Sequence, residues 1–154
     1  MGACEYQEMS HGKTAAEAFH RAVTQAQYEY GHGGYTGTIA EKYDFTVFDL
    51  PPRVMAEKVM AALRWAALHM QFTADPVCAR QWDRTQVTRA KREWEWLVSK
   101  FDAYTVREMV RLYNDKWGPA VGFRVTGKQA DRYRLYNTMK RGERVFVFCG
   151  LASS

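Results

Sequence analysis

The sequence predicts one α+β domain over residues 1–154, with a mixed or antiparallel sheet formed by strands near the two chain ends. Three observations predict this fold. Short alternating or continuously apolar segments lie near both ends, and apolar residues at helical spacing fill the middle. A chain of 154 residues is long enough to bury one sizeable core. We expect the helical middle to pack on one face of the sheet, with residues 76–113 as a basic helical insertion.

The elements follow from local patterns. In order, we expect a strand at 3–9, a helix at 15–30, extended segments at 38–40 and 43–50, helices at 53–70, 85–101 and from 105 onward, and strands at 120–126 and 144–151. Residues 72–83 are expected to connect two helices. Residues 128–140 are compatible with a short helix or with one arm of a hairpin.

Capping residues and breakers set several of these boundaries. Thr14 with Glu17, and Thr105 with Glu108, match the capping box of a helix start. Gly31 is expected to end the first helix, because glycine adopts the left-handed conformation at low cost.

The last predicted strand is continuously apolar. Its residues, RVFVFCGL over 144–151, contain no alternating polar positions. A strand with this composition is typical of a buried, central position in a sheet.

Charge is unevenly distributed along the chain, whose net charge is +5. Residues 1–75 contain six Lys/Arg and nine Asp/Glu, whereas residues 76–154 contain sixteen and eight. This asymmetry predicts a basic surface for an acidic partner, either nucleic acid or protein. The alternative is a solvated charged face without a partner.

The cysteines and the N-terminal residues argue against several classes of protein. Cys4, Cys78 and Cys149 are widely separated, so neither a zinc motif nor a CxxC redox motif is present, and reduced thiols are expected. The first residues lack the charged and apolar regions of a signal peptide. The longest apolar segment is too short to span a bilayer, so no membrane association is expected.

The glycine-rich segment 31–37 is the first candidate site. His32, Tyr35 and Thr36 are the reactive groups in it, and they would serve a small enzyme. A phosphate-binding loop normally precedes a helix N-terminus, whereas this segment follows a helix C-terminus, so a structural turn is favoured. No catalytic motif or metal-binding spacing is present, and we expect no catalytic residue, metal or cofactor.

The basic helical region is the second candidate and the stronger one. Cations and aromatic side chains of this mixture contact nucleic acids or anchor protein interfaces. The expected partner-binding residues are Arg80, Arg84, Arg89, Lys91, Arg92, Trp96, Arg132 and Arg134. Intramolecular ion pairs and core packing are the competing explanation for the same residues.

Three segments resemble small hypothetical proteins carried by bacteriophages and prophages. The first contains the pattern GHxxYxGTI after a helix, in residues 12–42. The others are DKWGPA at 115–120 and FxGxAS at 148–153. The resemblance implies a phage or mobile-element setting and implies no activity. It does not include the basic middle of the chain, roughly residues 76–113.

Together these observations favour a phage accessory protein that acts by binding in the cytoplasm of a bacterial host. Our first hypothesis is an anti-defence inhibitor of the anti-CRISPR type, which docks on a host protein or ribonucleoprotein effector through its basic half. The second is a nucleic-acid-binding protein. The third is a small enzyme that uses the loop containing His32 and Tyr35. The sequence does not determine the oligomeric state.

Overall fold

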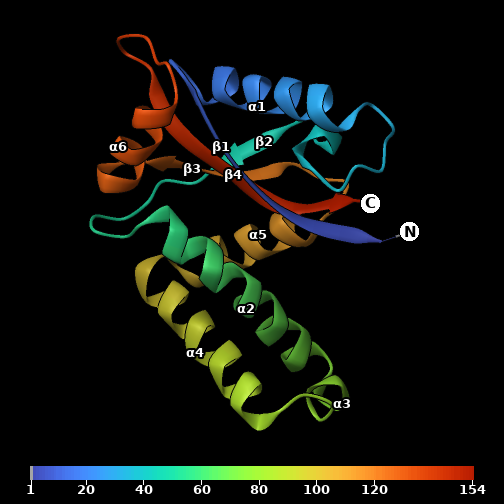
Figure 1. The fold of residues 1–154 in the computed structure, drawn as a ribbon. Coiled ribbons are helices and arrows are strands. Elements are labelled where there is room, and N and C mark those ends of the chain that lie inside the picture. The colour runs from blue at the N-terminus through green and yellow to red at the C-terminus, as the bar shows by residue number, and fades with distance from the viewer. Residues whose placement is uncertain (1) are drawn as a thin grey trace. The chain divides into compact units, whose positions relative to one another are not determined.

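A computed structural model describes residues 2–154, which form two compact units (Figure 1). Residues 2–50 and 115–154 form the first, here called the sheet unit. Residues 51–114 form the second, the helical unit. The helical segment inserted between the two parts of the sheet unit therefore begins at residue 51, well before residue 76.

The sheet unit contains a mixed four-stranded sheet in the order β1-β4-β3-β2. Its strands are β1 (Ala3–Gly12), β2 (Phe45–Val47), β3 (Ala120–Val125) and β4 (Arg144–Ser153). Strand β4 pairs antiparallel with β1 from Arg144–Gly12 to Ser153–Ala3, and antiparallel with β3 on its other side. Strand β2 joins β3 in parallel. The predicted α+β class and the central position of the last strand are confirmed.

Helix α1 (Ala15–Tyr30) covers one face of this sheet. Its buried residues are small, Ala18, Ala22 and Ala26, which allows the helix to lie close to the strands. Aromatic rings of the sheet pack beneath it, and the ring of Phe148 contacts those of Phe19 and Phe45 at centroid distances of 5.5 and 5.9 Å. The predicted capping residue Thr14 accepts a hydrogen bond from Glu17 N, as expected.

Two segments of the sheet unit differ from the sequence prediction, and a third settles the alternative between helix and hairpin at 128–140. Residues 39–41 form a short 3₁₀ helix, η1 (Ile39–Glu41), and the predicted extended segment is wrong. The reason is that the Thr38 hydroxyl accepts from Ala40 N and caps this turn. Strand β2 is shorter than the predicted 43–50. The ambiguous segment after β3 forms a helix, α6 (Gly127–Tyr136).

The helical unit consists of α2 (Ala56–Ala74), α3 (Pro76–Ala79), α4 (Arg84–Lys100) and α5 (Ala103–Asn114). The long predicted helices are confirmed, and α2 packs along α4 and against α5. The expected connector at 72–83 is wrong in part, because α2 continues to Ala74 and α3 follows. None of the helices described, across residues 2–154, is long and apolar enough to cross a membrane.

The predicted capping box of the last helix in this unit is also wrong. The Asp102 carboxylate, not the Thr105 hydroxyl, accepts at the helix start, from Thr105 N at 2.8 Å and Thr105 Oγ1 at 2.7 Å. Glu108 instead binds Arg111. Aspartate is a stronger N-cap than threonine. Because Asp102 caps the helix, α5 begins at Ala103 and not at the predicted residue 105.

The contribution of the α1–sheet core can be tested with Phe148→Ala. Phe148 is fully buried, so truncation should reduce the free energy of unfolding by about 3–5 kcal/mol, measured by urea denaturation. Tyr136→Ala is the control, because Tyr136 is 83% exposed and its loss should change stability by less than about 0.5 kcal/mol. Equal effects of the two changes would contradict this assignment of the core.

Candidate functional site

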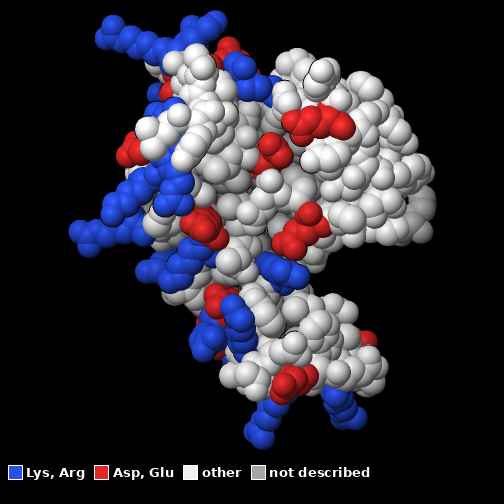
Figure 2. Space-filling view, viewed as in Figure 1, with Lys and Arg blue, Asp and Glu red and all other residues white. Residues whose placement is uncertain are grey.

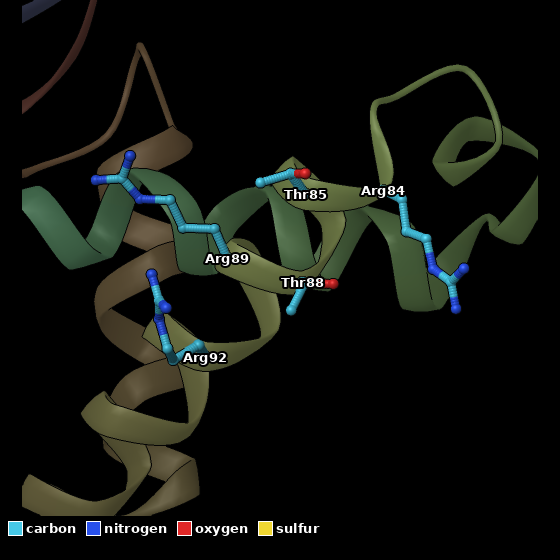
Figure 3. Close-up of a pocket in the computed structure, with 5 residues that line it drawn as sticks. All are labelled: Arg84, Thr85, Thr88, Arg89 and Arg92. Atoms are coloured by element: carbon cyan, nitrogen blue, oxygen red, sulfur yellow. The ribbon is translucent and has the colours of Figure 1, made fainter.

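Five residues of α4 line a shallow pocket of about 570 Å³ on the helical unit (Figure 3). They are Arg84, Thr85, Thr88, Arg89 and Arg92, here called the arginine face. Spacings of three and four residues place them on one side of the helix. Figure 3 shows Arg89 and Arg92 extending at one end of the pocket, Arg84 at the other, and the two threonines between them.

The arginines of this face have no acidic partner. Within residues 2–154, no carboxylate lies within 4.0 Å of the guanidinium groups of Arg84, Arg89 or Arg92. The Arg89 guanidinium lies over the Trp65 ring of α2, 4.6 Å from its centroid. This cation–π contact restricts the side chain and leaves its charge uncompensated. The face therefore offers guanidinium and hydroxyl donors to an external anion.

The structure brings together only some of the predicted binding residues. Arg84, Arg89 and Arg92 share the pocket, whereas Lys91 faces Glu95 at 3.9 Å. The Trp96 ring is covered by Lys58, whose Nζ lies 4.5 Å from the ring centroid. Trp96 is therefore already occupied within the unit.

The remaining predicted binding residues lie elsewhere. Arg80 follows α3 as its C-terminal cap. Arg132 and Arg134 belong to α6 of the sheet unit, where Arg134 pairs with Asp131 at 3.2 Å. The basic half of the sequence is thus divided between the two units, and Figure 2 shows basic and acidic side chains interspersed on both.

The helical unit carries most of the excess positive charge. It contains eleven Lys/Arg and seven Asp/Glu, whereas the sheet unit contains eleven and ten. The arginine face is therefore the basic surface that the sequence pattern most directly predicts.

The three residues of the predicted loop site have different surroundings. Thr36 donates from its backbone N and its hydroxyl to Glu41 Oε1, at 3.0 and 2.7 Å. The ring of Tyr35 makes an edge contact with Trp117 at a centroid distance of 6.4 Å, and His32 is exposed. Thr36 therefore stabilises the loop, and the three side chains do not converge on one reacting position.

Lys42, a buried residue that the sequence analysis did not single out, links the end of this loop to the turn at 115–118. Lys42 is only 2% exposed, and its Nζ donates to the carbonyls of Asp115 and Gly118 at 2.9 and 3.0 Å. Burial is the main cause that lowers the Lys42 pKa to about 8, against the opposing effect of Asp115. Nearby, the hydroxyl of Tyr6 is buried without a hydrogen-bond partner, and burial raises its pKa.

The loop that contains the glycine-rich segment contacts two other parts of the sheet unit. The loop contacts the DKWGPA segment through Tyr35 and Lys42, and it contacts the end of β4 through Gly37 N, which donates to Ser153 O at 2.8 Å. These contacts are packing and hydrogen bonds of the sheet unit.

The described histidines, acids and cysteines lie apart from one another or are buried. Across residues 2–154, no group of three or more His, Cys, Asp or Glu is arranged to hold a metal ion. Cys4, Cys78 and Cys149 are all free thiols. Cys149 is fully buried, and burial raises its pKa to about 12.

Comparison with known proteins adds no relative. No protein-family model matches the chain, and searches of curated proteins and of solved structures found no match.

The buried lysine gives a pH-dependent prediction. The Lys42 pKa is about 8 in the folded protein and has an ordinary value of 10.5, so between these pH values the folded state releases its proton first. Because the unfolded state then binds more protons, stability relative to Lys42→Met should rise with pH, by about 2–3 kcal/mol between pH 8 and 10.5. Urea denaturation of both proteins across this range measures the difference. A difference that is flat or falls with pH would contradict the assignment.

Proposed function

We propose that this protein acts by binding, and that the arginine face of α4 docks on an acidic surface of a host protein or ribonucleoprotein effector. In the phage or mobile-element setting that the resemblance implies, such a protein would be an anti-defence inhibitor of the anti-CRISPR type. The observation that carries the proposal is the group of three arginines, without acidic partners, on one side of one helix.

The chemistry of the arginine face supports docking on anions. Guanidinium groups bind carboxylates and phosphates through paired, charge-assisted hydrogen bonds. Arg89 is already held by Trp65, so less conformational entropy is lost when it binds. Complementary charge of this kind mainly accelerates association and selects the partner.

Direct nucleic-acid binding is the second candidate. Thr85 and Thr88 lie between the arginines, and hydroxyl and guanidinium groups are the side chains that most often contact phosphate oxygens. The arginine face would then follow a phosphate backbone and would not read base sequence.

The two candidates are tested with the double variant Arg84→Glu/Arg92→Glu, which reverses two charges of the arginine face. The native protein is immobilised on a resin and exposed to nuclease-treated host lysate. It should retain a protein partner that mass spectrometry identifies. The variant should bind the purified partner at least about tenfold more weakly, because two favourable charge contacts become repulsive. Lys100→Glu/Arg107→Glu is the matched control, since it reverses two exposed charges of the same unit outside the pocket.

The outcomes separate the candidates. In lysate that has not been treated with nuclease, retention of nucleic acid alone, lost as salt rises and weakened only by the Arg84/Arg92 variant, would replace the first candidate with the second. Equal retention of the same partner by both variants would overturn the arginine face as the binding surface.

A further inference from the structure

The sheet unit has a second cleft, of about 610 Å³, that is independent of the arginine face. It lies between the outer side of α1 and the turn that precedes β4. Its lining residues are Lys13, Glu17, His20, Arg21, Thr24, Gln25, Lys140 and Glu143. The volume is within the range of small-molecule sites in proteins.

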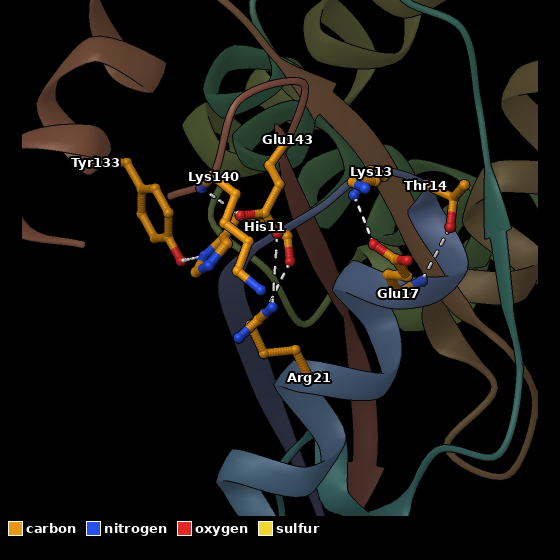
Figure 4. Close-up of polar contacts among 8 residues, drawn as sticks. All are labelled: His11, Lys13, Thr14, Glu17, Arg21, Tyr133, Lys140 and Glu143. Atoms are coloured by element: carbon orange, nitrogen blue, oxygen red, sulfur yellow. Dashed lines mark hydrogen bonds and ion pairs between the residues drawn. The ribbon is translucent and has the colours of Figure 1, made fainter. Parts of the chain in front are cut away.

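The two carboxylates of this cleft are already engaged within the chain (Figure 4). Glu17 Oε2 accepts from the backbone N of Lys13 at 2.8 Å. Glu143 is 94% buried at its side chain, accepts from Lys140 N at 2.5 Å and faces Arg21 Nη2 at 3.6 Å. These bonds stabilise the ionised form of Glu143, and the bond from Lys140 is the main cause that lowers its pKa. The acids thus serve to build the cleft.

The cations of the cleft are only partly used. The ammonium groups of Lys13 and Lys140 have no carboxylate within 4.0 Å in the part of the chain that the structure describes. The contacts with Glu17 and Glu143 are made by the backbone nitrogens of Lys13 and Lys140. The side chains of both lysines are exposed. Two ammonium groups and one guanidinium therefore border the same space.

Arg21 is held in position by contacts with the His11 carbonyl and with Glu143. Its Nε donates to the carbonyl of His11 at 3.0 Å, and the His11 Nδ1 lies 2.9 Å from the Tyr133 hydroxyl of α6. Figure 4 shows the guanidinium of Arg21 joined by dashed lines to the His11 backbone and to Glu143. His11 is buried, and this burial followed by the charge of Arg21 lowers its pKa, so a neutral imidazole is favoured beneath the guanidinium. The Arg21 guanidinium is therefore positioned before any ligand binds, while its side chain remains 52% exposed.

We propose that this cleft binds a small molecule through a phosphate group, held by Lys13, Arg21 and Lys140. Lys13 and Lys140 have no carboxylate partner among the described residues, and together with the guanidinium of Arg21, which also faces Glu143, they supply donors for the several oxygens of a phosphate. Thr24 and Gln25 extend the polar wall along α1 and would contact the remainder of the ligand. The site belongs to the sheet unit and does not depend on the function proposed for α4.

The test is calorimetric titration of the full chain at 150 mM salt with inorganic pyrophosphate, and with succinate as a dicarboxylate of similar size. Pyrophosphate should bind more tightly than succinate. Lys13→Gln/Lys140→Gln should weaken pyrophosphate binding at least about tenfold, because each lost charge-assisted contact reduces affinity. Both substitutions keep the backbone contacts of these residues, so folding should be unaffected, which circular dichroism verifies.

A further variant makes the result specific to this cleft. Lys128→Gln removes an exposed lysine of the same unit outside the cleft and should bind pyrophosphate as the native protein does. Absence of pyrophosphate binding, equal binding by the native protein and the Lys13/Lys140 variant, or an equal loss of binding in Lys128→Gln would each overturn the proposal.

Discussion

The sheet unit depends on the hydrogen bonding of one buried strand, β4. Its residues from Val145 to Gly150 are all buried, so their backbone groups can be satisfied only by neighbouring strands. Strand β1 pairs along its whole length on one side and β3 on the other. The alternating side chains of β4 then place Phe146 and Phe148 toward α1, where small helix residues accommodate them. Sheet order and helix position both follow from this one requirement.

The end of the same strand organises the long loop after α1. Gly37 adopts a φ of 70°, donates to the Ser153 carbonyl, and lies so close to Cys4 that a Cβ would approach it to 3.0 Å. Glycine is required here by conformation and by space. Lys42 completes the attachment by satisfying two carbonyls of the 115–118 turn. The glycine-rich segment is thus part of a connection between α1 and β2 that is held in place by these contacts. The turn conformation and close packing explain the glycine at position 37 without a ligand.

The two candidate binding regions use positive charge in different ways. On α4 the arginines have no acidic partner, and a tryptophan restrains one of them, which suits a surface that meets another macromolecule. Beside α1, acids and cations alternate, the acids are bonded internally, and one arginine is fixed between His11 and Glu143. The second arrangement is an open cleft with one oriented guanidinium and two ammonium groups that have no carboxylate partner among the described residues, which suits a small anion.

Local patterns in the sequence determined the α+β class, the long helices, the first helix cap and the buried last strand, because periodicity, capping chemistry and apolar runs act over a few neighbouring residues. The basic face of α4 was also visible, since helical spacing alone aligns Arg84, Arg89 and Arg92. Only the tertiary structure decided that Arg132 and Arg134 belong to the other unit, that Lys42 is buried against the turn at 115–118, and that Lys140 and Glu143 border α1. The last two relations join residues from 73 positions apart (Lys42 and Asp115) to 122 positions apart (Arg21 and Glu143), and they exist only after strand pairing brings those segments together.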